Sequence, residues 1–220
     1  SGAGSLYFND EQSEAALNTG SGDITLSAGT GDIRAEEFSY PDPDYDQAQP
    51  ELETSGVIDL GISSTGAGQI GDSQLSSPDP GSGNGPIQIQ TGHAEVNVTN
   101  APDGVWIEGL GGEIVIGTIS GTVGIVSLTV FETTEYIRLT QNLTTDGENI
   151  VFGRPVRVDE TGITVSTGAG VGGDIDFKET VDSQSGEGNN LTLVAGSGDI
   201  YFRGAVGRDG SGFGGAEEFD

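Results

Sequence analysis

Short runs of alternating or uniformly apolar residues recur along the chain, and they are rich in Ile, Val, Thr, Tyr and Phe. Gly, Asn, Asp or Ser bounds each run, which is typical of short β-strands. Helical spacing of apolar residues is found only in the short segment Asp10–Leu17. The sequence therefore predicts an all-β chain, with strands at Asp23–Leu26, Val57–Ile62, Ile87–Ile89, Glu95–Val98, Val105–Ile107, Glu113–Ile116, Thr122–Val130, Tyr136–Leu139, Asn149–Phe152, Val156–Val158, Gly162–Val165, Asp174–Phe177, Asn190–Val194 and Asp199–Phe202.

A short phrase, Gly-Asp-Ile leading into a strand, is repeated. It occurs in Gly20–Leu26, Gly29–Arg34, Gly172–Phe177 and Gly196–Phe202. Short strands joined by glycine turns in a degenerate repeat favour a parallel β-helix (β-solenoid), whose successive coils stack about 4.8 Å apart. A β-sandwich accounts for the strand spacing equally well, but not for the recurring phrase, and it stays as the alternative fold.

Two proline-rich segments interrupt the strand pattern. The first covers about residues 39–54 and contains Tyr40–Glu53, and the second is Ser76–Pro86. We expect both to be loops that project from a single β-solenoid segment spanning residues 1–220. Loops on a rigid scaffold are where binding sites concentrate.

Composition excludes several classes of function. The chain has 35 acidic and 7 basic residues, a formal net charge of −28, which repels the phosphates of nucleic acids. The absence of cysteine excludes disulfides and thiolate chemistry, and a single histidine, His93, excludes multi-histidine metal sites. No apolar stretch approaches the ~18 residues of a membrane span, so we expect no membrane insertion.

The first proline-rich segment has the acidic spacing of a calcium loop. Asp42, Asp44 and Asp46 alternate, and Glu53 is the twelfth residue counted from Asp42. Carboxylates at these positions supply the oxygen ligands of EF-hand loops, which makes calcium the one cofactor with candidate ligands. The pattern departs from that loop because glutamine replaces the invariant glycine and two prolines intervene. A solvated acidic loop is the alternative interpretation.

No residue is assigned a catalytic role, and we expect that the protein is not an enzyme. Asp174 and Asp176 fall on one face of a predicted strand, as paired carboxylates of glycosidases can. The same alternation is expected of any half-buried strand that turns its acids outward. Tyr40, Tyr45 and Trp106 are the aromatic candidates for stacking on a glycan.

The stretch Ile137–Gly207 resembles the repeats of giant secreted bacterial proteins, the filamentous-haemagglutinin-like adhesins. The likeness lies in the phrases TTDGENIVF, ITVSTGAGVGGDIDF, LTLVAGSGDIYF and GAVG, and Gly20–Arg34 adds a shorter match. The resemblance implies a right-handed parallel β-helix on the cell surface, acting as a stalk, adhesin or filament component. It implies no chemistry.

We therefore expect a structural, secreted protein of the cell surface, a segment or subunit of a fibre that joins copies of itself, or adjoining repeats of a longer chain, head to tail. An open stack of coils exposes unpaired strand edges at its ends. The apolar residues expected at such an interface are Leu6, Tyr7, Phe8, Phe213 and Phe219. The alternative is an adhesin module that binds a glycan or a partner protein through the two projecting loops.

Overall fold

The computed structural model describes residues 4–9, 17–36, 52–63, 67–72, 84–91, 95–110, 113–130, 136–170, 172–184 and 187–207. All the regular elements in these residues are strands, and none of the described residues forms a helix long and apolar enough to cross a membrane. The strands are β1 (Leu6–Asn9), β2 (Leu17–Gly20), β3 (Ile24–Ala28), β4 (Ile33–Glu36), β5 (Leu52–Thr54), β6 (Ile58–Ile62), β7 (Gln69–Ile70), β8 (Asn84–Gly85), β9 (Ile87–Thr91), β10 (Glu95–Ala101), β11 (Gly104–Leu110), β12 (Glu113–Val123), β13 (Val126–Val130), β14 (Tyr136–Leu139), β15 (Leu143–Thr144), β16 (Ile150–Phe152), β17 (Val156–Val158), β18 (Ile163–Ser166), β19 (Ile175–Phe177), β20 (Val181–Ser183), β21 (Leu191–Val194) and β22 (Ile200–Phe202).

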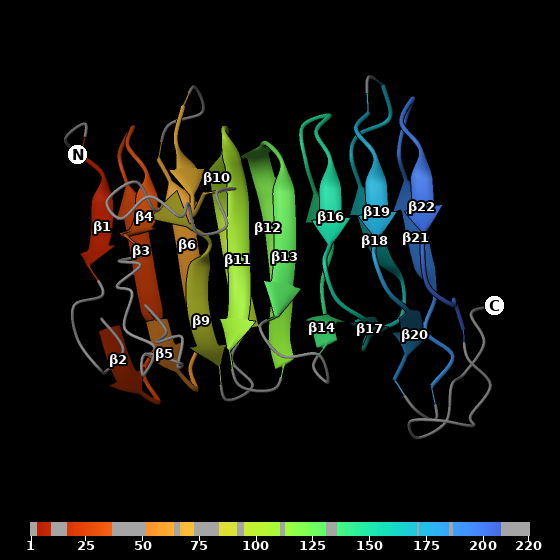
Figure 1. Ribbon diagram of the computed structural model, residues 1–220, viewed down its shortest axis with the longest axis horizontal. Helices are drawn as coiled ribbons and strands as arrows, with labels where there is room; N and C mark the ends of the chain where they lie inside the picture. Colours follow the sequence, from red (N-terminus) through yellow and green to blue (C-terminus); the bar gives the residue numbers. More distant parts are fainter. Residues whose placement is uncertain are drawn as a thin grey trace, which may run out of the picture.

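The strands form two sheets. The first sheet has 12 strands and runs β1-β4-β7-β11-β13-β16-β19-β22, with β2, β5, β8 and β9 beside this path. The second has 10 strands and runs β3-β6-β10-β12-β14-β17-β20, with β15, β18 and β21 beside it. Among the described strands the pairings are parallel except for β4 with β8. In Figure 1 the strands stand side by side along the long axis, from β1 at one end to β22 at the other.

The chain passes back and forth between the sheets. After β16 in the first sheet come β17 and β18 in the second, then β19 in the first, β20 and β21 in the second, and β22 in the first. Each strand therefore pairs with a strand of the previous passage rather than with its neighbour in sequence. In this part of the chain one passage takes 25 residues, since Ile150, Ile175 and Ile200 lie opposite one another.

The core is a single cluster of buried apolar side chains to which both sheets contribute. Alternate residues of a strand point to opposite faces, and the burial of the strands follows this period of two. In β18, for example, Ile163 and Val165 are buried and their neighbours are partly exposed. Isoleucine, valine and leucine make up most of the cluster, as expected for parallel strands with a well-covered face.

Aligned register places like residues on top of one another. Phe152 lies opposite Phe177, and Phe177 lies opposite Phe202. Their rings stack with centroids 4.7 Å and 5.1 Å apart and nearly parallel planes. We call these three residues the phenylalanine ladder. It joins β16, β19 and β22 through the interior of the first sheet.

The all-β prediction is confirmed, and Tyr136–Leu139 and Val156–Val158 form strands with the predicted bounds. Several other bounds differ from the prediction. The run Thr122–Val130 is divided between β12 and β13, because the chain passes from the second sheet to the first there. Leu52–Thr54 forms β5, so the first proline-rich loop cannot extend to residue 54. Leu17, the last residue of the one segment with helical spacing, begins β2. The other residues of Asp10–Leu17 and of the first proline-rich segment lie outside the described residues, as does most of Ser76–Pro86.

Candidate functional site: the two edges of the first sheet

The aspartate of the Gly-Asp-Ile phrase ties each strand to the next. Asn149 Oδ1 accepts a hydrogen bond from the backbone N–H of Asp174 (2.7 Å), and Asp174 Oδ1 accepts one from the N–H of Asp199 (2.8 Å). Near the other end, Ser5 Oγ accepts the N–H of Asp32 at 3.0 Å. In each pair the side chain of the earlier strand satisfies the backbone of the later one. Unpaired backbone N–H groups are costly, so this position favours short oxygen-bearing side chains.

The glycine of the phrase is needed because neighbouring backbones approach closely. A Cβ on Gly31 would lie 2.7 Å from the backbone nitrogen of Ser5, and one on Gly173 would lie 2.7 Å from Asn149 Oδ1. A Cβ on Gly198 would collide with the backbone of Gly173. At Gly4, the equivalent position of the first strand, no atom of the described residues lies within 4 Å. The first strand thus has the same glycine without the described neighbour that Gly31, Gly173 and Gly198 have.

The N-terminal edge of the first sheet is β1, which pairs on one side with β4. Leu6 lies opposite Ile33 and Tyr7 opposite Arg34. Leu6 is 36% exposed and Tyr7 58%, while Phe8 is half-buried against the core. Of the predicted interface residues, these three are therefore on an outermost strand. Phe213 and Phe219 lie outside the described residues.

The C-terminal edge is β22, which pairs on one side with β19. Ile200 is 40% exposed and Phe202 43%, although Ile175 and Phe177, their partners on β19, are almost completely buried. The Tyr201 hydroxyl donates to Asp199 Oδ2 at 3.0 Å, and this bond raises the pKa of Tyr201. Within the described part of the chain, Asp199 Oδ1 accepts no hydrogen bond.

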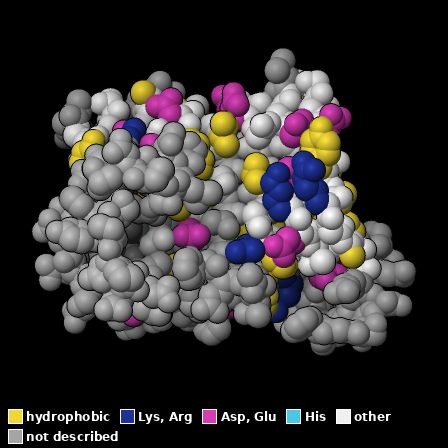
Figure 2. Space-filling model, in the orientation of Figure 1, with side chains coloured by type: hydrophobic (Ala, Val, Ile, Leu, Met, Phe, Trp, Pro, Cys, Tyr) yellow, Lys and Arg dark blue, Asp and Glu magenta, His cyan; other side chains and the backbone are white. Residues whose placement is uncertain are grey.

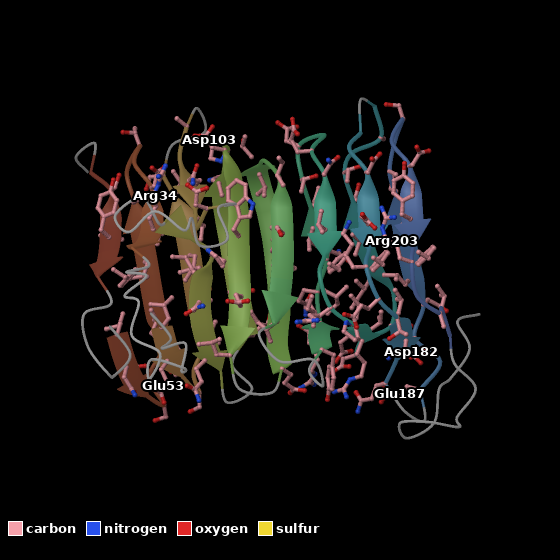
Figure 3. All side chains as sticks on the ribbon, in the orientation of Figure 1. Arg34, Glu53, Asp103, Asp182, Glu187 and Arg203 are labelled. Carbon is pink, nitrogen blue, oxygen red and sulfur yellow. The ribbon has the colours of Figure 1, made fainter. Side chains whose placement is uncertain are left out.

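A cluster of charged side chains joins the end of β22 to the neighbouring strand β19. Asp176 on β19 accepts two hydrogen bonds from Arg203, at 2.8 and 2.9 Å, and lies 2.5 Å from Lys178 Nζ. The hydrogen bond from Arg203, followed by that from Lys178, holds the pKa of Asp176 below its usual value. Arg203 is labelled beside β22 in Figure 3, and Figure 2 shows that basic side chains gather on this part of the visible face.

A second cluster joins three strands of the second sheet. Arg138 on β14 bonds Glu113 at 2.6 Å and also Asp159, while Arg157 on β17 bonds Asp159 at 2.8 Å and the Tyr136 hydroxyl at 2.6 Å. Burial, reinforced by the bond with Glu113, raises the pKa of Tyr136. Burial lowers the pKa of Arg138, but its bonds to Glu113 and Asp159 outweigh this and raise it. The cluster pairs opposite charges and holds β12, β14 and β17 side by side.

The candidate calcium ligands are not assembled in the described residues. Asp42, Asp44 and Asp46 lie outside them. Glu53 is on β5, where its Oε2 accepts a hydrogen bond from Asn18 Nδ2 at 2.7 Å (labelled in Figure 3), so its expected place in a loop was wrong. In the part of the chain that the structure describes, no three His, Cys, Asp or Glu side chains are grouped as metal ligands.

The other candidates for chemistry are placed as follows. Asp176 is on β19 and bonds Arg203 and Lys178, whereas Asp174 precedes that strand and accepts a hydrogen bond from the backbone of Asp199, so each acid is engaged with a different partner. Trp106 is half-buried on β11, and its ring occupies the space that a Cβ on Gly104 would need. Tyr40, Tyr45 and His93 lie outside the described residues.

Ile200 and Phe202 are the edge residues that the sequence analysis missed. They were assigned to a strand, but nothing marked that strand as outermost. The signal that could have found them is the match of Gly198–Phe202 to Gly4–Phe8, the segment that contains the predicted interface residues Leu6, Tyr7 and Phe8.

No protein-family model, curated protein or solved structure matches this chain. What the two edges can do is therefore inferred from their own residues.

Proposed function

We propose that this chain is a structural protein of the cell surface or extracellular space, a segment or subunit of a fibre, stalk or filament that assembles end to end. This proposal rests on one observation, the exposed edges of β1 and β22. Among the described strands they are the two ends of the main path of the first sheet, and both expose apolar side chains. Unpaired strand edges of this kind favour pairing with another strand.

The proposal includes a parallel β-helix as the architecture of the assembled unit. In support, the chain alternates between two sheets, and the strands of successive passages pair in parallel and in aligned register. Aligned β-sandwiches, the alternative from the sequence, are built mainly from antiparallel strands. A parallel stack also grows in one direction only, which suits an elongated structural element.

The distribution of charge supports growth at the ends rather than at the sides. The net charge of −28 keeps parallel copies apart laterally. The strand edges, by contrast, present Leu6 and Tyr7 at one end and Ile200 and Phe202 at the other. The extracellular location rests on the resemblance of Ile137–Gly207 to secreted repeat proteins. The adhesin function would depend on loops that lie largely outside the described residues.

Sedimentation velocity and negative-stain microscopy over a range of concentrations test the proposal. We expect oligomers that grow with concentration and rods that lengthen without thickening. Raising the salt from about 0.01 M to 0.15 M shortens the Debye length from about 30 Å to about 8 Å and should strengthen association by reducing repulsion between copies. A monodisperse monomer at every concentration and salt would contradict end-to-end assembly.

A further inference from the structure

We propose that the strand completing the β22 edge is β1 of a second copy of this chain. The two strands would pair in parallel, with Leu6 opposite Ile200, Tyr7 opposite Tyr201 and Phe8 opposite Phe202. This inference rests on the proposed end-to-end assembly and goes beyond it by naming the partner strand and its register. It also replaces Phe213 and Phe219 with β22 as the C-terminal contact.

The two strands match position by position. Gly4-Ser5-Leu6-Tyr7-Phe8 aligns with Gly198-Asp199-Ile200-Tyr201-Phe202, with an identical or similar residue at every position. Since β1 and β22 are opposite edges of one parallel sheet, a translation along the sheet brings them together in the pairing used within the molecule. Such a contact joins two different surfaces, so it generates a fibre unless it closes into a ring.

The apolar side chains of the two strands continue the core. Phe152 and Phe177 are covered on both sides, whereas Phe202, in the same ladder, is 43% exposed. Phe8 in the proposed register would extend the phenylalanine ladder by one ring. Leu6 would cover Ile200 in the same way that Ile200 covers Ile175. Burying aromatic and aliphatic surface of this kind is the main source of free energy in association.

The polar groups are complementary in the same register. Within the molecule, the N–H of the later strand donates to the aspartate or asparagine of the earlier strand, as Asp199 does to Asp174 Oδ1. Asp199 Oδ1 is the corresponding acceptor of β22, and no described residue donates to it. The N–H of Ser5 from the next copy is placed to donate to this oxygen.

Gly4 provides an independent observation. Gly31 and Gly198 have glycine because the backbone of the preceding strand occupies the position of a Cβ. Gly4 has no described neighbour within 4 Å, so packing against the described residues does not require glycine there. A preceding strand would require it. In the proposed register that strand contributes Gly198, which lies over Gly173 in the same manner inside the molecule.

Disulfide trapping tests the register, and the chain suits it because it contains no cysteine. Full-length chains carrying Tyr7→Cys and Tyr201→Cys are mixed, oxidised and mapped by peptide mass spectrometry. Neighbouring strands lie about 4.8 Å apart, which is within the Cα separation that disulfides span. We expect a mixed disulfide that joins the Tyr7→Cys chain to the Tyr201→Cys chain through the two introduced thiols. Val151→Cys, at the equivalent position of the interior strand β16, is the matched control and should not link to Tyr7→Cys.

Each other outcome overturns the proposal in a distinct way. Links between two Tyr7→Cys chains or between two Tyr201→Cys chains would indicate a symmetric dimer. Oligomers that form without the mixed link would refute the register and leave end-to-end assembly standing. Monomers under all conditions would refute both. If Tyr201→Cys in a monomer resists a small thiol reagent, the chain itself covers β22 and a second copy is not its partner.

Substitution of Gly4 provides a second test. Because Gly4 has no described neighbour within 4 Å and no left-handed backbone, Gly4→Leu should leave the unfolding midpoint of the monomer unchanged. It should weaken association at least tenfold by blocking the approach of Gly198. Gly170 also has no described neighbour within 4 Å and belongs to neither edge strand, so Gly170→Leu is the control that should assemble normally. Wild-type assembly by the Gly4→Leu chain would overturn the proposal.

Discussion

Strands β19 and β22 have nearly the same sequence and the same backbone role, yet one is interior and the other is at the surface. Ile175 and Phe177 are almost fully buried, whereas Ile200 and Phe202, opposite them, are about two-fifths exposed. Both strands follow a Gly-Asp pair whose glycine contacts the preceding backbone. The difference lies in the next strand, which is present after β19 and absent from the described residues after β22.

In β19 and β22 the local structure of the strand and the burial of its side chains have separate causes. The phrase determines the local strand, its inward face and its hydrogen bonds to neighbours. The number of neighbours determines whether the inward face becomes core. A core residue and an assembly residue can therefore be the same residue type in the same position, and variants at matched positions should distinguish the two roles.

Phenylalanine-to-alanine substitutions at the two positions should give the largest difference. Phe177→Ala removes a ring that is stacked on both sides, and it should reduce the free energy of unfolding by about 3–5 kcal/mol. Phe202→Ala removes a ring stacked on one side only and should cost the monomer about 1–2 kcal/mol. Urea unfolding at a concentration where the chain is monomeric measures both.

In association between copies, Phe202→Ala should have the larger effect of the two variants, the reverse of their order in stability. If Phe202 lies in a junction, Phe202→Ala weakens association, while Phe177→Ala acts only through the stability of the fold. Equal losses of stability in the two monomers would contradict the distinction between interior and edge strands. Sedimentation under conditions where both variants remain folded provides the comparison.

Acid should weaken the attachment of β22 to β19 through Asp176. Arg203 and Lys178 hold the pKa of this carboxyl below its ordinary value. The folded state therefore binds the proton less readily than the unfolded chain, whose aspartates titrate near pH 3.9. The stability contributed by the ionised group is fully present above that pH, and it is lost as the pH falls through the lower pKa of the folded state.

Asp176→Asn measures this contribution. The variant should be less stable than the wild type at pH 7, and the difference should shrink toward zero as the pH falls below the folded pKa. Urea midpoints between pH 7 and pH 2 provide the data. Glu160 is an exposed acid, and Glu160→Gln is the control that should follow the wild type throughout. A stability difference for Asp176→Asn that did not change with pH would indicate a packing effect instead.

Much of the fold could be predicted because the strands carry their own signal. Alternation of isoleucine, valine and phenylalanine with polar residues fixes which side chains face inward, and most of the fourteen predicted strands match an observed strand within one or two residues. The two-residue strands Gln69–Ile70, Asn84–Gly85 and Leu143–Thr144 were missed because so few residues cannot establish a period, and Val181–Ser183 was missed because it has a single apolar residue. β5 was missed because it directly follows a proline-rich acidic segment, whose composition suggested a continuous loop.

Of the two edges that form the candidate site, only the N-terminal one could be predicted from the sequence. Leu6, Tyr7 and Phe8 stood out as apolar residues of an early repeat, and they do lie on an outermost strand. Ile200 and Phe202 resemble the interior Ile175 and Phe177 so closely that composition cannot separate them. Only the pairing order of the strands distinguishes an edge from the interior, and pairing order depends on contacts between residues far apart in sequence.

The smallest effect should come from the aspartates of the repeated phrase. Asp174→Ala removes the acceptor for the N–H of Asp199 and should cost about 0.5–1 kcal/mol, because water partly replaces the lost bond at this half-exposed position. Asp199→Ala should leave the stability of the monomer almost unchanged, since no described backbone N–H depends on its side chain. If Asp199 instead accepts Ser5 of the next copy, its removal weakens association several-fold while Asp174→Ala does not. Unfolding and sedimentation measurements on the two variants therefore test, at matched positions, whether the hydrogen bond that joins strands inside the molecule also joins one copy to another.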